Sequence, residues 1–350
     1  MHLQILHIVL YCYAVLKNVR SVALKKSIIY IILATFFFST MEIALKLTAG
    51  NFNPIQLTFL RFLIGSVILM PLAIKQLKQK NISLRPADFA FFALTGLICI
   101  NISMILYQMA VLYAPAATVA VLFSCNSVFL ILFAFFLLGE KIQFNTAICI
   151  VLSLLGMIVM IDPLHFAGSA AGTILSLAAA VTFALYNAVG HMKSNRYGGI
   201  VLTCFSFLFG CAEMLVLIFI THLRPAALFL QNAGLTKFAN VPVFSGISVS
   251  SLPGLAYVGI FVTGCGFAFY FLAIETAGAA KAALVFFCKP VLAPLLSLAI
   301  LRETITPKMM IGIALIVIGS CFTFLPKPML RRTSVPAGTV PPSRNSSQKD

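Results

Sequence analysis

The chain has 350 residues, of which 61% are hydrophobic and only 9% carry a charged side chain. A soluble globular domain has about 25% charged residues, so this composition excludes a water-soluble particle and predicts a protein embedded in a lipid bilayer. The formal net charge of +16 would also fit a nucleic-acid-binding protein. The distribution of the positive charges, described below, argues against nucleic acid as a partner.

A membrane-spanning helix needs about 20 mostly apolar residues. Stretches of this kind occur at 27–48, 54–75, 89–112, 115–138, 145–162, 169–191, 199–221, 252–275, 279–301 and 308–325. Four of them open with a proline in the first turn, where a helix tolerates it best: Pro54, Pro115, Pro253 and Pro307. The stretches are too long and too uniformly apolar for a β-barrel. The sequence therefore predicts an all-α integral membrane protein with ten transmembrane helices.

The orientation follows from the positive charges. With a cytoplasmic N-terminus, most of the 24 Lys and Arg residues fall in the inside segments, which satisfies the positive-inside rule and predicts that both termini are cytoplasmic. Residues 1–26 are expected to form a cytoplasmic or interfacial segment. The tail 326–350 is rich in Pro, Ser and charge and is expected to be disordered. The nine cysteines, which lie almost entirely within spans, are expected to be small buried hydrophobes.

Two parts of the chain resemble each other. Residues 114–142 align with 277–305 without a gap, and 11 of 29 positions are identical, including Glu140 with Glu303. Beyond this window Tyr107 aligns with Tyr270. The duplicated unit holds five spans, so the second copy must lie upside down in the membrane. We expect two five-helix repeats, 27–162 and 163–325, around a central cavity, an organisation typical of secondary transporters.

Three motifs resemble the EamA-type members of the drug/metabolite transporter superfamily. They are PIQLTFLRF at 54–62, LLGEK at 137–141, and the region from TGCGFAFYF to IVIGS in the last third of the chain. The resemblance covers about residues 27–325 and implies a ten-helix carrier that moves small metabolites, commonly by efflux. Two positions depart from the family pattern. Lys289 stands where the family often has Glu, and Ser127, preceded by Asn126, replaces the matching proline of the fourth span.

Five ionisable side chains lie within the spans: Glu42 and Lys46 in the first, Arg61 in the second, Glu213 in the seventh and Lys289 in the ninth. Counting from the helix ends places Glu42 and Arg61 at similar depths, so we expect an ion pair between these two side chains to clamp the helices. Glu42 could pair instead with Lys46, four residues further on. Glu213 is a candidate partner of Lys289, a candidate carrier of a coupling proton, or a static partner within the bundle.

Lys289 is the most unusual of these residues, because a lysine at the bilayer centre costs roughly 2.5–3.5 kcal/mol. Pro290 and Pro294 weaken the same helix by removing backbone hydrogen bonds, and the freed carbonyls need protein or a water-filled cavity to satisfy them. We expect Lys289 to contact the substrate and the two prolines to act as a hinge. The alternative is a permanent ion pair of Lys289 with Glu42 or Glu213.

The five charges sum to one spare positive charge if they all face one cavity, and a substrate with a carboxylate or phosphate would complement it. Besides Lys289, the residues expected to bind substrate are Arg61, Tyr107, Tyr270, Asn126 and Asn187. No cofactor or metal is predicted. Protons are a candidate coupling ion.

The sequence thus predicts a multi-pass transporter of the bacterial plasma membrane that exports a small metabolite, such as an amino acid or a related compound, by alternating access. One alternative is an exchanger of nucleotide sugars or sugar phosphates, from a related branch of carriers that hold phosphate with buried lysine and arginine. Another is a non-transporting membrane receptor. An enzyme is not expected, because the chain has no HExxH, GxSxG or GxxxxGK[ST] motif.

Overall fold

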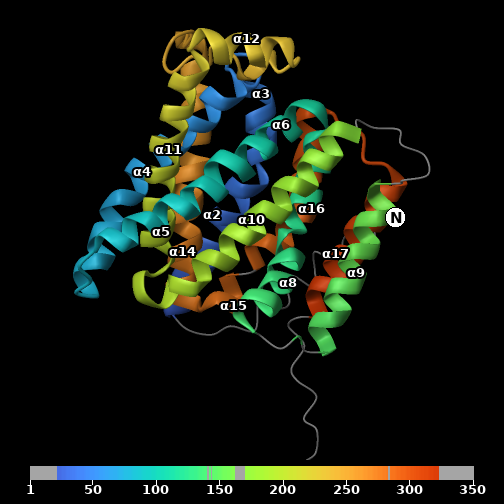
Figure 1. The fold of residues 1–350 in the computed structure, drawn as a ribbon. Coiled ribbons are helices and arrows are strands. Elements are labelled where there is room, and N and C mark those ends of the chain that lie inside the picture. The colour runs from blue at the N-terminus through green and yellow to red at the C-terminus, as the bar shows by residue number, and fades with distance from the viewer. Residues whose placement is uncertain (1–21, 140–141, 143, 162–169, 283, 323–350) are drawn as a thin grey trace, which may run out of the picture.

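The structure is a computed structural model that describes residues 22–139, 142, 144–161, 170–282 and 284–322. Every regular element within these ranges is a helix, and most of the helices form one bundle (Figure 1). The expected tail 326–350 and all but the last five residues of the expected segment 1–26 lie outside the described residues, as does Glu140.

The first half of the chain contains α2 (Val22–Ser39), α3 (Met41–Thr48), α4 (Pro54–Gln79), α5 (Pro86–Gly96), η1 (Leu97–Met104), α6 (Ile105–Tyr113), α7 (Ala116–Ser124), α8 (Asn126–Leu138) and α9 (Phe144–Ile161). The second half contains α10 (Ala170–Tyr197), α11 (Gly199–Thr221), α12 (Arg224–Asn232), η2 (Thr236–Phe238), η3 (Val249–Ser251), α13 (Leu252–Ala256), η4 (Tyr257–Cys265), α14 (Gly266–Ala277), α15 (Ala279–Ala282), α16 (Leu284–Leu301) and α17 (Pro307–Phe322).

Among the described residues, nine helical stretches are long and apolar enough to cross a membrane. They coincide, apart from a few residues at their ends, with the first nine stretches predicted from the sequence. The tenth predicted stretch, 308–325, contains the apolar helix α17 (Pro307–Phe322), and the last three residues of this stretch lie outside the described residues. The prediction of an all-α membrane protein is therefore confirmed, with nine of the ten predicted spans found among the described residues.

The helix starts follow from local sequence. Pro54 is the first residue of α4, and the side chain of Asn53 caps this helix by accepting a hydrogen bond of 2.9 Å from the backbone N–H of Ile55. Pro86 opens α5, where the carboxylate of Asp88 accepts the backbone N–H of Arg85 at 2.8 Å. These contacts satisfy backbone donors that the first turn of a helix would otherwise leave unpaired.

The second span of each half meets the other in the core of the bundle. The rings of Phe62 on α4 and Phe207 on α11 lie with centroids 4.6 Å apart in an edge-to-face arrangement. Helix α11 also packs closely on α5, where a Cβ atom on Gly96 would lie only 2.6 Å from the backbone of Gly210 on α11. Small residues here let the helices approach closely, which is how helices associate in a bilayer that supplies no hydrophobic driving force between them.

Helices α9 and α17 form a pair at one side of the bundle (Figure 1). A Cβ atom on Gly156 would lie 2.6 Å from the carbonyl oxygen of Gly312, and a Cβ atom on Gly312 would lie 2.6 Å from the carbonyl oxygen of Gly156. The two backbones are therefore in direct contact. Helix α9 packs mainly on α17 and only slightly on the rest of the bundle.

The bundle has two ends, each marked by a carboxylate that joins helices. Helix α3 ends, α7 begins and α16 ends at one of them, which we call the Glu303 face after the residue that connects these three helices. Helix α5 begins and α10 ends at the other, which we call the Asp88 face. In Figure 1, α12 lies above the Glu303 face and α15 lies at the opposite end.

Candidate functional site

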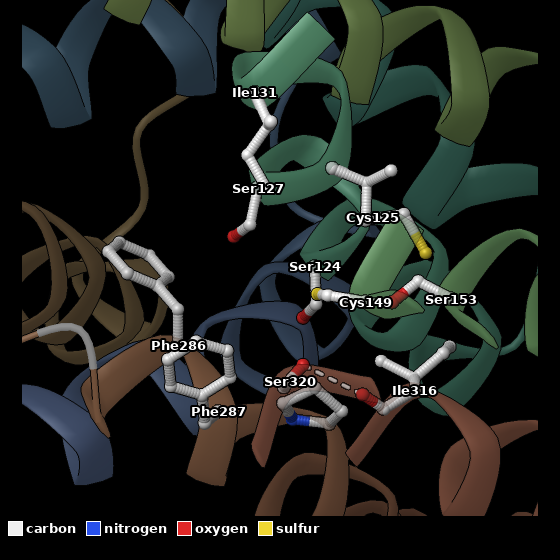
Figure 2. Close-up of a pocket in the computed structure, with 12 residues that line it drawn as sticks. Ser124, Cys125, Ser127, Ile131, Cys149, Ser153, Phe286, Phe287, Ile316 and Ser320 are labelled. Atoms are coloured by element: carbon white, nitrogen blue, oxygen red, sulfur yellow. Dashed lines mark hydrogen bonds between the residues drawn. The ribbon is translucent and has the colours of Figure 1, made fainter. Parts of the chain in front are cut away.

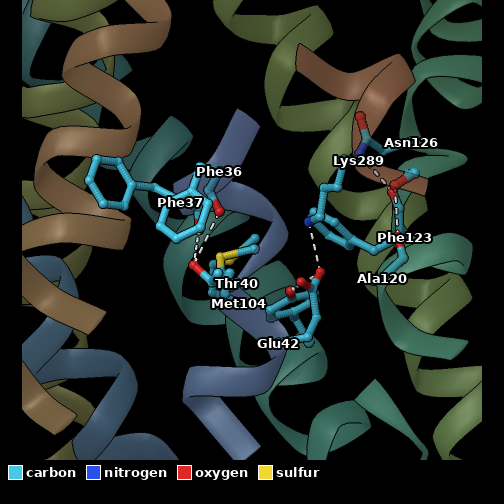
Figure 3. A network of polar contacts seen from close by, with 12 residues as sticks. Phe36, Phe37, Thr40, Glu42, Met104, Ala120, Phe123, Asn126 and Lys289 are labelled. Carbon is cyan, nitrogen blue, oxygen red and sulfur yellow. Dashed lines mark hydrogen bonds and ion pairs between the residues drawn. The ribbon is translucent and has the colours of Figure 1, made fainter. Parts of the chain in front are cut away.

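A buried ion pair joins the first and ninth spans. Lys289 Nζ on α16 lies 2.7 Å from Glu42 Oε1 on α3, and both side chains are at most 2% exposed (Figure 3). The hydroxyl of Tyr107 on α6 donates a hydrogen bond of 2.6 Å to the same carboxylate oxygen. The other oxygen of Glu42 is buried without a hydrogen-bond partner among the described residues. Breaking such a pair would leave an uncompensated buried charge.

Arg61 lies in the same region but has no carboxylate partner among the described residues. Its guanidinium group is 4.2 Å from the ring centroid of Phe62 and contacts the sulfur atoms of Met41 at 3.9 Å and Met104 at 3.4 Å. The side chain is 1% exposed, and its Nε is buried without a hydrogen-bond partner. The expected ion pair between Glu42 and Arg61 is not formed, and the carboxylate of Glu42 pairs with Lys289 instead.

Lys46 does not pair with Glu42 either. Its ammonium group turns to the Glu303 face, where Nζ lies 2.9 Å from Glu303 Oε1 and donates a hydrogen bond of 3.0 Å to the carbonyl oxygen of Ala114. The helical spacing of four residues would have permitted the pair with Glu42. The carboxylate of Glu42 pairs with Lys289 instead, and Lys46 pairs with Glu303, just beyond the end of α16.

Glu303 holds together three helices from the two halves of the chain. Its Oε1 accepts the backbone N–H of Ala116 at 3.0 Å, and its Oε2 accepts that of Ala117 at 3.1 Å, both in the first turn of α7. Ser297 Oγ donates a hydrogen bond of 2.6 Å to Oε2. Burial alone would raise the pKa of Glu303, but the hydrogen bonds from Ser297, Lys46 and the two backbone amides outweigh it and lower the pKa.

A second polar cluster stands at the Asp88 face. The carboxylate of Asp88 is 1% exposed and accepts hydrogen bonds from both guanidinium nitrogens of Arg196, at 3.0 and 3.2 Å. The hydroxyl of Tyr197 donates to the same carboxylate. This cluster ties the start of α5 in the first half of the chain to the end of α10 in the second half.

The other expected site residues lie apart from the Glu42–Lys289 pair or bond to their own helix. Glu213 on α11 is half-buried and accepts a hydrogen bond of 2.8 Å from the side chain of Asn101. Asn126 and Asn187 donate to backbone carbonyls of their own spans, at 2.6 and 3.0 Å. Tyr270 packs among aromatic rings, 5.1 Å from Phe286. Its repeat mate Tyr107 instead contacts the ion pair.

A small cavity of about 60 Å³ lies between the middle of α7–α8 and helices α9, α16 and α17. Its wall includes Ser127 and Pro290, which the repeat aligns with each other, and the hydroxyl groups of Ser124, Ser153 and Ser320 (Figure 2). The cavity is lined mainly by apolar atoms, and at this size it is too small for a metabolite. Pro290 and Pro294 are both buried inside α16.

The structure therefore distributes the expected residues over separate places rather than one cavity. Glu42, Lys289, Tyr107 and Arg61 come together, whereas Lys46 joins the Glu303 face and Glu213 bonds to Asn101. Sequence reasoning missed the role of Glu303. The alignment of Glu303 with Glu140 marked the position, but no residue count could show that its carboxylate reaches the amides of α7.

Comparison with known proteins agrees with a membrane carrier. The EamA-like transporter family model matches the chain twice, over residues 25–162 and 170–325. An uncharacterized transporter of Clostridium kluyveri is 37% identical over 309 residues, which cover 86% of this chain and 94% of the relative. The chain belongs to the EamA-like transporter family.

More distant relatives add less. An uncharacterized transporter of Archaeoglobus fulgidus is 22% identical and covers 85% of this chain and 97% of the relative. The pseudopaline exporter of Pseudomonas aeruginosa is 23% identical over 158 residues, which cover 45% of this chain and 54% of that protein. A crystal structure with 19% sequence identity and a TM-score of 0.59 covers 86% of this chain and 98% of its own, which supports the fold alone.

Proposed function

We propose that this transporter exports a small metabolite across the bacterial plasma membrane by alternating access, with its two repeats in opposite orientations. The observation that carries the proposal is the set of contacts around Glu303, which joins α3 and α7 of the first half to α16 of the second. Contacts of this kind must break when one face of a carrier opens. The family supports transport, and the distant relative named as an exporter supports efflux.

The positive-inside rule supports the orientation. With both termini cytoplasmic, the Glu303 face lies outside and the Asp88 face lies inside. The proposed repeats, 27–162 and 163–325, then contribute equivalent helices with opposite directions. In this proposal the contacts of Glu303 keep the outer side closed, and the hinge prolines Pro290 and Pro294 inside α16 let this helix bend when the outer side opens.

The proposed substrate region surrounds Lys289, Arg61 and Tyr107, with Asn126, Asn187 and Tyr270 on the path that leads to it. A proton is the proposed coupling ion. Glu213 is the candidate carrier of this proton, and its half-buried position and its hydrogen bond to Asn101 are compatible with that role. The two buried cations also favour a second candidate function, the exchange of phosphorylated sugars, because lysine and arginine are the side chains that hold phosphate.

The test is counterflow in liposomes that contain the purified protein. The liposomes are loaded in turn with amino acids, organic acids, sugars and sugar phosphates, and uptake of the radiolabelled compound is followed. Wild type is compared with Lys289→Ala and with Lys80→Gln, which removes an exposed positive charge at the end of α4. Counterflow that Lys80→Gln retains and Lys289→Ala loses supports the proposal. Absence of counterflow with every compound would favour a receptor.

A further inference from the structure

Within the part of the chain that the structure describes, Arg61 is a buried cation without a counter-ion. Lys289 has Glu42, and Lys46 has Glu303, but the guanidinium group of Arg61 contacts only two thioether sulfurs and one aromatic ring among the described residues. Sulfur is a weak hydrogen-bond acceptor. A permanently charged group that is 1% exposed is costly in a membrane interior unless an anion compensates it.

A second buried polar side chain, Gln108 on α6, is also without a hydrogen-bond partner among the described residues. Gln108 is fully buried, and neither its amide nitrogen nor its amide oxygen has a hydrogen-bond partner among the described residues. It lies four residues after Met104, whose sulfur contacts Arg61, so the two side chains share one face of the helix. Because buried polar side chains are nearly always paired, the Gln108 amide has a donor and an acceptor available for a polar ligand.

The Glu42–Lys289 pair sets the charge of the region. Glu42 neutralises Lys289 at 2.7 Å and leaves one net positive charge, that of Arg61. Arg61 is close enough to Glu42 and Tyr107 to interact with both electrostatically. An arriving anion would therefore meet an arginine that is free to bind it and a lysine that is held by an internal carboxylate.

We propose that Arg61 and Gln108 form the binding site for the oxyanion group, a carboxylate or a phosphate, of the transported metabolite, and that Glu42 is the internal competitor of this anion for Lys289. The inference rests on the proposed transport function and names its substrate class. The planar guanidinium group can hold a carboxylate or a phosphate through two parallel hydrogen bonds, and Gln108 can donate a further hydrogen bond. Removal of Glu42 would free Lys289 to bind the anion as well.

Anion binding can be measured separately from transport by tryptophan fluorescence. Because the chain contains no tryptophan, a single introduced tryptophan reports on its own surroundings. Phe123→Trp places a single tryptophan near the ion pair, since the Phe123 ring lies 5.4 Å from Lys289 Nζ and 4.5 Å from the Tyr107 ring. Phe136→Trp is the control reporter, because Phe136 is 75% exposed on α8. The full-length protein in detergent is titrated with sodium succinate, sodium phosphate and, as a cationic control, choline chloride.

We expect a saturable fluorescence change with succinate or phosphate in Phe123→Trp but not in Phe136→Trp. Choline is expected to cause no saturable change in either variant. In the Phe123→Trp background, Arg61→Gln is expected to weaken anion binding at least about tenfold, the loss of one charged hydrogen bond. Lys80→Gln is expected to leave it unchanged, and Glu42→Gln is expected to strengthen it. If Arg61→Gln does not fold, Arg61→Lys keeps the charge, loses the paired hydrogen bonds and is expected to bind more weakly.

A titration in which neither anion produces a saturable change in Phe123→Trp, alone or combined with Glu42→Gln, would overturn the proposal. Equal affinities of Phe123→Trp with and without Arg61→Gln would overturn it as well. The outcome is separate from that of the transport assay. Anion binding without counterflow would leave the site intact and refute transport, whereas counterflow restricted to neutral or cationic compounds would refute the anion site and leave transport intact.

Discussion

Lys46 and Glu303 come from opposite halves of the chain, and their side chains meet at 2.9 Å on one face of the bundle. The same carboxylate accepts the backbone amides of Ala116 and Ala117. Because the first amides of a helix have no partner within that helix and carry a partial positive charge, Glu303 acts as a cap for α7 that is supplied by the other repeat. Glu303 therefore joins the two halves of the chain at this face, and we call this set of contacts the closure of the face.

Replacement of Glu303 by glutamine is expected to loosen this closure. Glutamine keeps the size of the side chain but removes the charge that strengthens the hydrogen bonds from Lys46 and the two amides. Hydrogen exchange of the peptide that contains Ala116 and Ala117 is expected to accelerate on the order of tenfold, the effect of about 1.4 kcal/mol.

The matched control for this change is Glu275→Gln. Glu275 is an exposed carboxylate that accepts a hydrogen bond of 2.7 Å from Gln76 near the ends of α4 and α14. Exchange at the start of α7 should not respond to it. Equal exchange rates in wild type and Glu303→Gln would mean that the carboxylate does not hold the face closed.

Acidification is expected to weaken the same closure. The folded protein lowers the pKa of Glu303, because the hydrogen bonds from Ser297, Lys46 and the α7 amides outweigh the effect of burial. A carboxylate with a lowered pKa stabilises the fold fully at pH values above its ordinary pKa, and this stabilisation is lost as the pH falls through the lowered value. The difference in Tm between wild type and Glu303→Gln should therefore be largest near neutral pH and should shrink in acid. A difference that stays constant over this range would contradict the assignment.

The Glu42–Lys289 ion pair is expected to contribute to the free energy of unfolding. Glu42→Ala or Lys289→Ala alone leaves one buried charge and is expected to cost about 3–5 kcal/mol. The double variant removes both charges, so its cost should be clearly smaller than the sum of the two single costs. Unfolding of the purified variants in detergent measures all three. Additive costs would show that the two side chains do not stabilise each other.

The contact between α9 and α17 can be tested with a single methyl group. Gly312→Ala would place its Cβ atom 2.6 Å from the carbonyl oxygen of Gly156 and push the helices apart, at a cost of about 1–3 kcal/mol. Gly50→Ala is the control, because no atom lies within 4 Å of the added Cβ at that position. Similar unfolding midpoints of the two variants would contradict the direct backbone contact.

The positions of the helices could be predicted from the sequence, because the length of an apolar stretch is fixed by the thickness of the bilayer. The pairing of the charges could not. Depth counting placed Glu42 and Arg61 at the same level, but a pair also depends on which way each helix is rotated, and the rotation brings Lys289 to Glu42 instead. The partner of Lys46 could not be predicted either. This partner, Glu303, lies beyond the end of a span and is therefore not among the intramembrane charges.

The pairing of α9 with α17 has a consequence for how the protein is made. A ribosome completes α9 well before it reaches α17, because the whole second repeat up to α16 lies between them. During that interval α9 lacks its main partner and must remain inserted with most of its surface against lipid. The last step of folding would then be the insertion of α17 and its packing against α9, which is already in the membrane.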